Sequence, residues 1–146
     1  MAETVSSIDA EIITATDDSS LPYLVGTDGY VYLGLAGREF LCNTTGNDFE
    51  SGNDTHYIYG DGANVTEPEL NDPRNPALNI SDLDHTPAYI RFAPLASDPK
   101  DHWLLERVDV TVTGNNGSKV QYSILAGSDR LWLSADSGLT VHLKKI

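Results

Sequence analysis

Alternation of apolar and polar side chains is the dominant pattern along the chain. In VYLGL (31–35) every second side chain is apolar, and VDVTV (108–112) repeats this. Runs of the same kind occupy residues 8–16, 55–60, 88–95, 119–125, 130–134 and 139–145. A period of two is typical of a β-strand with one face against a core. The pattern therefore predicts about eight short strands, separated by Gly, Asn, Asp and Pro, and we find no helical pattern.

Short strands at this spacing are the sequence signature of a β-sandwich. A length of 146 residues fits one domain with one core. We therefore predict an all-β fold, an antiparallel sandwich of eight strands over residues 1–146. The side chains expected to face the core are Val31, Leu33, Leu35, Ile90, Phe92, Leu105, Val108, Val110, Leu131, Leu133, Leu139, Val141 and Leu143.

Two segments depart from the alternating pattern. Residues 60–87 carry four of the seven prolines and many Asp and Asn residues, so we expect a long surface loop inserted there, with a short edge strand near 78–80. A loop longer than ~12–15 residues is usually functional or disordered. AGREFLC (36–42) is interpreted as a bend after the strand 31–35.

Charge narrows the possible partners. The chain has 22 acidic residues against 9 Lys and Arg, a formal net charge of −13. Nucleic-acid binding rests on basic side chains that meet phosphates, so we expect no nucleic-acid partner. The same charge opposes unaided binding to an anionic membrane. Clustered carboxylates are, however, the ligands that Ca²⁺ prefers.

Sequence motifs for catalysis and targeting are absent. The chain has no G-x-S-x-G, H-E-x-x-H or P-loop motif, and its four histidines are scattered without ligand spacing. We therefore expect no enzyme. The single Cys42 excludes an internal disulfide and is predicted to be a free thiol in a core strand. MAETVSSIDAEI lacks the features of a signal peptide, and no apolar run approaches ~18 residues, so we expect a soluble protein.

The segment NTTGNDFESGNDT (43–55) has far more oxygen-bearing side chains than a turn requires. Two other loops at strand ends, 16–29 and 96–103, are acidic as well. If all three share one end of the sandwich, their charges repel unless a cation lies between them. Pattern alone leaves two interpretations open, a cation site and independent solvated turns.

The quoted segments resemble the PLAT (LH2) family, named for polycystin, lipoxygenase and α-toxin. GTDGYVYLGL (26–35) is similar to the family's Gly-Thr-Asp strand, and GNDFESGNDTHYI (46–58) to its Asn-x-Phe-x-x-Gly-x-x-Asp segment. HWLLERVDVTV (102–112) is similar to its Trp-x-Leu-x-x-Val-x-Val strand. Three matches in the right order are specific. Within the family, the resemblance is strongest to the C-terminal calcium- and membrane-binding domains of clostridial α-toxins.

This resemblance implies an eight-stranded antiparallel sandwich that binds Ca²⁺ in its loops and docks on membrane lipid, without catalytic activity. One implied calcium site uses the backbone at Gly26 with the Asp101 carboxylate and the His102 carbonyl. A second uses Asn43, Thr44, Gly46 and Asp48. Thr27, Asp28 and Asn47 complete a shell or a third site.

The chain departs from the α-toxin pattern at two places. Leu24 stands where those domains have Asp, and Asn43-Thr44 replaces Asp-Asn. Fewer charged ligands imply weaker binding, in the micromolar to millimolar range. Leu24 in turn suggests a membrane-contact group formed by Leu21, Tyr23, Leu24 and Trp103, because Trp and Tyr favour the headgroup level of a bilayer. The alternatives are a loop folded back on the core, and a core or rim position for Trp103.

Three functions therefore follow from the sequence. The first is a calcium-dependent domain that docks on phospholipid headgroups and is peripheral to a membrane. The second is a calcium-dependent protein-docking module that uses the 60–87 loop, since this family also binds proteins. A carbohydrate-binding sandwich ranks below both, because no aromatic platform is evident.

Overall fold

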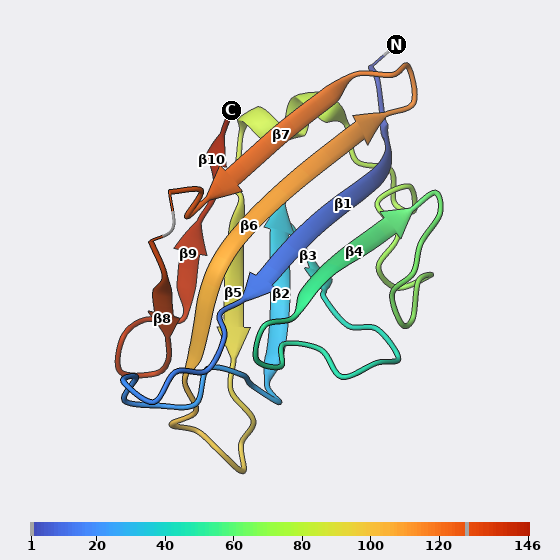
Figure 1. Cartoon of the computed structure of the whole chain (residues 1–146). Coiled ribbons are helices and arrows are strands. Elements are labelled where there is room, and N and C mark those ends of the chain that lie inside the picture. Colours follow the sequence, from blue (N-terminus) through green and yellow to red (C-terminus); the bar gives the residue numbers. More distant parts are fainter. Residues whose placement is uncertain (1, 128) are drawn as a thin grey trace.

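The computed structural model describes residues 2–127 and 129–146 and shows a sandwich of two antiparallel sheets (Figure 1). The strands in these ranges number ten rather than eight. They are β1 (Val5–Thr14), β2 (Tyr30–Leu35), β3 (Arg38–Leu41), β4 (Asp54–Gly60), β5 (Tyr89–Ala93), β6 (Trp103–Gly114), β7 (Lys119–Ile124), β8 (Leu131–Leu133), β9 (Thr140–His142) and β10 (Lys144–Lys145). The predicted all-β sandwich is thus confirmed, with a higher strand count.

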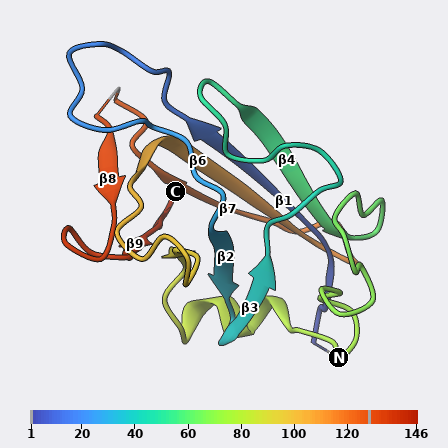
Figure 2. The ribbon, with the colours of Figure 1, turned by 90° about the horizontal axis from the view of Figure 1, so that it is seen from below.

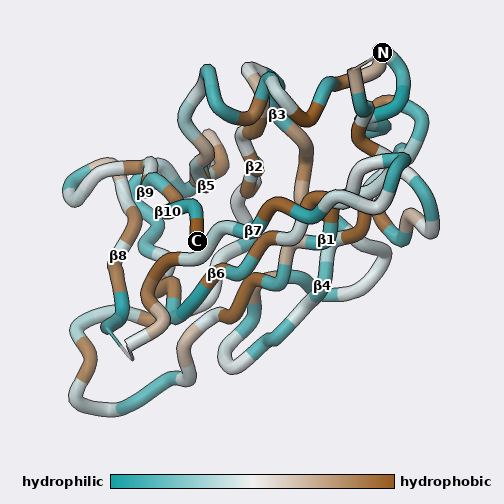
Figure 3. The backbone as a smooth tube through the Cα atoms, turned by 90° about the horizontal axis from the view of Figure 1, so that it is seen from above, coloured by the Kyte–Doolittle hydropathy of each residue, from teal (hydrophilic) through white to brown (hydrophobic). Residues whose placement is uncertain are grey.

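The larger sheet has the strand order β10-β7-β6-β1-β4, with β8 paired to the start of β6. The smaller sheet has the order β3-β2-β5-β9. Brown and teal segments alternate along the strands of the larger sheet in Figure 3, as a period of two requires. The apolar sides of both sheets face each other and form one main core. Its largest fully buried side chains include Trp103, Tyr57, Tyr59, Phe40 and Phe92.

The extra strand β3 occupies the segment that the sequence suggested was only a bend. Its hairpin with β2 is closed by Ala36 and Gly37, with φ of 53° and 78°. Two positive φ values are typical of the tight turn that matches strand twist. Asn-Gly usually signals such a turn, so Ala-Gly gave a weak signal. The C-terminal run is likewise two strands, β9 and β10, and Leu139 at its start is exposed rather than inward.

The long segment 60–87 is a loop, as predicted, with one 3₁₀ helix, η1 (Ile80–Asp84), that the sequence pattern did not reveal. The expected edge strand near 78–80 is reduced to a single bridge between Thr4 and Asn79. Asn71 fastens the loop to β3, because its side-chain oxygen accepts a hydrogen bond of 2.8 Å from the Leu41 N–H. Within the described residues, no helix is long and apolar enough to cross a membrane.

Candidate functional site

Three connecting loops meet at one end of the sandwich. They run from β1 to β2 (residues 15–29), from β3 to β4 (42–53) and from β5 to β6 (94–102). Antiparallel pairing brings the C-terminal end of β1 beside the start of β4 and β6, and the start of β2 beside the ends of β3 and β5. Figure 2 looks onto this end and shows the loops across it. The expectation that the acidic loops share one end is therefore correct.

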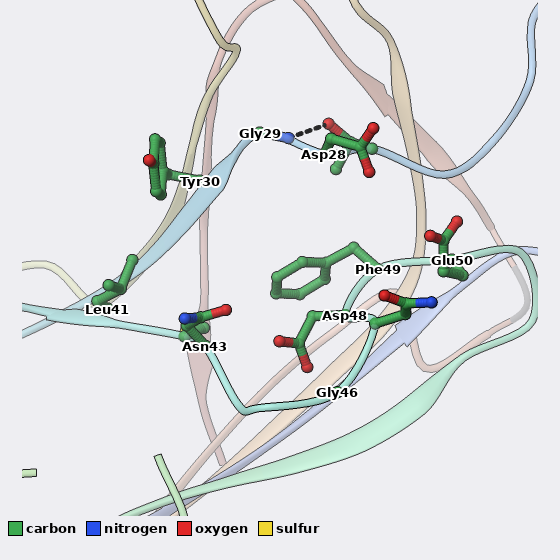
Figure 4. A pocket seen from close by; sticks show the side chains of 12 residues that line it. Asp28, Gly29, Tyr30, Leu41, Asn43, Gly46, Asp48, Phe49 and Glu50 are labelled. Atoms are coloured by element: carbon green, nitrogen blue, oxygen red, sulfur yellow. Dashed lines mark hydrogen bonds between the residues drawn. The ribbon is translucent and has the colours of Figure 1, made fainter. Parts of the chain in front are cut away.

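Two adjoining hollows lie among these loops. The first, the asparagine hollow, has a volume of about 190 Å³, and Figure 4 shows its lining. Its oxygen-bearing side chains are Thr27, Asp28, Tyr30, Asn43, Asn47, Asp48 and Glu50. The second, the aspartate hollow, has a volume of about 400 Å³ and holds the carboxylates of Asp17, Asp28, Glu50, Asp98 and Asp101. No Lys or Arg is among the described residues lining either hollow.

Thr27 ties the two hollows to the scaffold. It is buried, its N–H donates to the Phe49 carbonyl at 3.0 Å, and its hydroxyl donates to the Asp101 carboxylate at 2.5 Å. The same hydroxyl oxygen accepts the Gly29 N–H at 2.9 Å, the bond drawn as a dashed line in Figure 4. One side chain thus joins the first and third loops and fixes the direction of the Asp101 carboxylate, which lines the aspartate hollow.

Asp48 is the most firmly oriented carboxylate of the asparagine hollow. Its two oxygens accept the Thr44 N–H at 2.8 Å, the Thr44 hydroxyl at 2.8 Å and the Tyr57 hydroxyl at 3.0 Å. Three donors hold the side chain in one geometry without a counter-charge. An added cation would therefore meet a carboxylate that is already positioned.

Gly26 is required by a close approach between loops. A Cβ there would lie 2.9 Å from the Phe49 carbonyl oxygen, too close for any side chain. Gly46 has no such constraint, since a Cβ would meet only the Thr44 hydroxyl at 3.7 Å. The positive φ values of the second loop fall at Phe49 (61°) and Gly52 (75°). Gly46 is not among the residues of positive φ, so its position does not require a glycine.

Most of the predicted ligand set is brought together. Gly26, Thr27, Asp28 and Asp101 line the aspartate hollow, and Asn43, Gly46, Asn47 and Asp48 line the asparagine hollow. Thr44 and His102 line neither hollow; Thr44 instead holds Asp48, and the His102 ring stacks on Tyr23 at 3.6 Å between ring centroids. The residues that sequence reasoning missed are Asp17, Glu50 and Asp98. They lie in or beside the acidic segments, but only the fold directs them to one place.

Trp103 was assigned to the membrane contact, and this assignment is wrong. Its side chain is 0% exposed, packs against Phe49 and Phe92, and donates from Nε1 to the Thr14 hydroxyl at 2.9 Å. Residue 103 is the first of β6, where alternation turns it inward. Trp103 therefore packs in the core beneath the three loops and does not reach the protein surface.

The other members of the membrane-contact group differ in exposure. Leu21 is half-buried against a small core cluster that includes Val25 and Leu104, so it anchors the first loop. Tyr23 is 50% exposed and Leu24 is 79% exposed. Leu24 also lines the aspartate hollow, so an exposed apolar side chain stands directly beside the carboxylates.

Cys42 is buried and free, as predicted, but it follows the last residue of β3 and does not lie in a strand. Burial raises the pKa of its thiol to about 12. The group is therefore a neutral thiol at neutral pH, although it lines the asparagine hollow. A thiolate is the form that binds soft metals, so this hollow offers oxygen ligands only.

A second group of possible metal ligands lies on the outer face of the larger sheet. Glu11 on β1 and Asp54 and His56 on β4 each offer a ligand atom, all within 4.8 Å of one another. The close Asp54 carboxyl raises the pKa of Glu11, and the hydrogen bond to Asp9 raises that of His56. His56 is exposed and lies on β4, and its spacing from the other histidines along the chain gave no sign of a ligand group. Strand pairing places it among carboxylates.

Comparison with solved structures gives two similar proteins. The alpha-toxin from Clostridium absonum matches with a TM-score of 0.62 and 24% identity, covering 99% of this chain and 32% of the toxin. The alpha-toxin of an avian strain of Clostridium perfringens matches with a TM-score of 0.57 and 21% identity, covering 97% of this chain and 32% of the toxin. Thus the chain spans about a third of the toxins' length. No family model and no curated protein sequence matches significantly.

Identity at this level establishes a shared fold. The match extends over almost the whole chain, so it includes both sheets and the three loops at the acidic end. The chain therefore has the β-sandwich fold found within clostridial alpha-toxin, as its resemblance to PLAT domains predicted.

Proposed function

We propose that this chain is a non-catalytic domain that binds Ca²⁺ in the two loop hollows and then docks on a phospholipid surface. The observation that carries the proposal is the convergence of carboxylates from three separate loops. Two adjoining hollows are lined by Asp17, Asp28, Asp48, Glu50, Asp98 and Asp101, and no Lys or Arg of the described part of the chain lines either. Like charges so arranged repel, and a divalent cation removes that repulsion.

The chemistry of the hollows favours Ca²⁺ over other divalent cations. Ca²⁺ takes six to eight oxygen ligands in flexible geometry, from carboxylates, amide or backbone carbonyls and water. The asparagine hollow combines the amides of Asn43 and Asn47 with the carboxylates of Asp28 and Asp48. Irregular loops supply such a set more easily than the near-ideal octahedron that Mg²⁺ demands.

Titration calorimetry tests the calcium step. We expect Ca²⁺ binding in the micromolar to millimolar range, with Mg²⁺ much weaker. Asp48→Asn and Asp101→Asn each remove a charged ligand and should weaken binding by roughly tenfold or more, since each tenfold corresponds to about 1.4 kcal/mol. Asp61→Asn, in the exposed start of the 60–87 loop, is the matched control. Absence of Ca²⁺ binding up to several millimolar would make the acidic loops solvated turns.

The membrane step relies on Leu24 and Tyr23. The net charge of −13 repels anionic headgroups until the loop end is neutralised. Bound Ca²⁺ reduces this local field, and the exposed Leu24 beside the aspartate hollow then enters the interface. Burying such a side chain contributes ~1.5–3 kcal/mol. Tyr23, stacked on His102, follows at headgroup level.

Co-sedimentation with phosphatidylcholine–phosphatidylserine vesicles tests this step. We expect binding with Ca²⁺ and none with EGTA. Leu24→Asp should lose roughly tenfold or more in affinity, in line with the burial energy of one side chain. Leu70→Asp is the control, because Leu70 is 68% exposed but lies in the 60–87 loop. Equal binding of Leu24→Asp and the unaltered chain would disprove insertion. Calcium binding without vesicle binding would instead favour a protein-docking module.

A further inference from the structure

We propose that His56, Glu11 and Asp54 form a second metal site, suited to a transition-metal dication such as Zn²⁺, on the outer face of β1 and β4. This site is separate from the loop hollows and does not depend on the proposed function. It differs from them in its ligands, because it includes an imidazole, and in its framework, because strands rather than loops supply every ligand.

Strand register places the three ligands on one face. Glu11 on β1 is paired directly with His56 on β4, and Asp54 precedes His56 by two residues. Residues two apart on a strand point to the same side. Their ligand atoms lie within 4.8 Å of one another. Zn²⁺ binds such atoms at about 2.0–2.2 Å in tetrahedral geometry, which places the ligand atoms about 3.3–3.6 Å apart. Side-chain rotations that bring the atoms together by about 1 Å would therefore close the site.

The orientation of His56 is the observation that points to a metal. Its Nδ1 lies 2.8 Å from an oxygen of Asp9. An ionised carboxylate only accepts hydrogen bonds, so Nδ1 carries the proton and Nε2 of the neutral ring presents a lone pair. Nε2 in turn lies 3.4 Å from Glu11 Oε2, which is also an electron-pair donor. In zinc sites, the ring nitrogen of a histidine that does not bind the metal commonly donates its hydrogen to a carboxylate, which fixes the orientation of the ring.

The ligand set selects the kind of metal. Imidazole nitrogen suits Zn²⁺, Cu²⁺ and Ni²⁺, whereas Ca²⁺ and Mg²⁺ prefer oxygen alone. One nitrogen and two carboxylates give three protein ligands, and a tetrahedral ion then keeps one position for water. His56 and Asp54 are exposed, so the position faces solvent. The competing arrangement is a proton on Nε2 that bridges His56 to Glu11 without any metal.

Zinc titration by calorimetry at about pH 7.5 separates these possibilities. We expect one Zn²⁺ per chain, with binding lost below detection in His56→Gln and in Glu11→Gln. His142→Gln, at an exposed histidine on β9, and Asp101→Asn, in the aspartate hollow, should bind zinc unchanged. Far-ultraviolet circular dichroism of each variant verifies folding. Absence of zinc binding, or zinc binding that His56→Gln retains, would overturn the proposal.

Asp9→Asn tests the positioning role of Asp9. An outer partner of this kind typically contributes 10–100-fold to metal affinity. We expect zinc affinity to fall by roughly tenfold or more, while the melting temperature of the zinc-free chain changes little. Nitrogen chemical shifts of the His56 ring should show the Nδ1–H form in the unaltered chain without metal and lose it in the variant. Unchanged zinc affinity in Asp9→Asn would overturn the positioning role given to Asp9.

Discussion

The loop hollows and the outer face of β1 and β4 both gather carboxylates, but they do so by different means. In the hollows, residues from three loops far apart in the sequence meet, and hydrogen bonds such as that from Thr27 to Asp101 fix their directions. On the sheet face, Glu11 and His56 meet because two strands pair in one register. The hollows therefore depend on tertiary packing beneath them, whereas the sheet cluster depends only on pairing of β1 with β4.

This difference makes the two regions separable by mutation. Packing changes below the loops should alter Ca²⁺ binding and leave zinc binding intact. Changes at the β1–β4 face should weaken zinc binding and leave Ca²⁺ binding intact. Three substitutions, taken from the largest expected effect to the smallest, sharpen or break the comparison.

Trp103→Ala should have the largest effect. It removes a fully buried ring that packs on Phe49 and Phe92 and a hydrogen bond to Thr14. Loss of a buried Trp side chain costs about 3–5 kcal/mol in unfolding free energy. Urea denaturation measures this, and calorimetry should show Ca²⁺ binding weakened while zinc binding persists in the folded variant.

Trp132→Ala is the matched control, because Trp132 is only partly buried beside Tyr23. We expect it to cost less than Trp103→Ala. A Trp103→Ala variant that kept full stability and full Ca²⁺ affinity would break the link between packing and the hollows.

Thr27→Val should have an intermediate effect. The change preserves shape but removes the hydroxyl that donates to Asp101 and accepts from the Gly29 N–H. A hydrogen bond to a charged group contributes about 1.5–3 kcal/mol, so unfolding free energy should fall by that order and Ca²⁺ affinity should fall with it. Thr45→Val, at an exposed position of the second loop, is the control. Equal Ca²⁺ affinities of the two variants would contradict the role given to Thr27.

Glu39→Gln should have the smallest effect, confined to acid pH. Arg91 donates two hydrogen bonds of 2.8 Å to Glu39, and the Tyr89 hydroxyl donates a third at 2.9 Å. The Arg91 bonds, above all, hold the pKa of Glu39 below its ordinary 4.5. A lowered folded-state pKa stabilises the fold above the ordinary value, and this contribution is lost as pH falls through the folded pKa.

Melting temperatures from about pH 6 down to pH 3 measure this contribution. The unaltered chain should lose stability more steeply below about pH 4.5 than Glu39→Gln. Glu69→Gln, at an exposed position of the 60–87 loop, should follow the unaltered chain. Parallel curves for Glu39→Gln and the unaltered chain would show that strand-face ion pairs contribute little here. That result would also weaken the expectation that strand pairing by itself, as between Glu11 and His56, produces an interaction of functional strength.

Sequence-based prediction was most successful for elements with strong alternation. Val108, Val110 and Val112 lie buried along β6, and Val31, Leu33 and Leu35 along β2, as their period of two requires. β3 was missed because its turn uses Ala36-Gly37 and its four residues carry only one buried side chain, Phe40. Leu139 alternates with Val141 and Leu143 but is exposed, because alternation identifies a face without showing what covers it.

The predicted site also contains residues that the sequence identified and residues that it missed. Eight of the residues that the family-like segments suggested line the two hollows, and their role as ligands stays a prediction. The sequence analysis did not identify Asp17, Glu50 and Asp98 as residues of the aspartate hollow. It also predicted Trp103 at the surface, whereas the side chain is buried in the core. Each depends on where a loop folds relative to another loop, and an acidic or aromatic residue near a strand end does not reveal that.

The sequence by itself determined the all-β class, most of the strands and the acidic character of the loops, since these follow from local periodicity and composition. The tertiary structure alone decided which carboxylates share a hollow, which way Trp103 points and that His56 faces Glu11. The physical reason is that these contacts join residues far apart in the chain. Strand register and the packing of the two sheets determine which of these residues come into contact. Neither can be inferred from a short segment of the sequence.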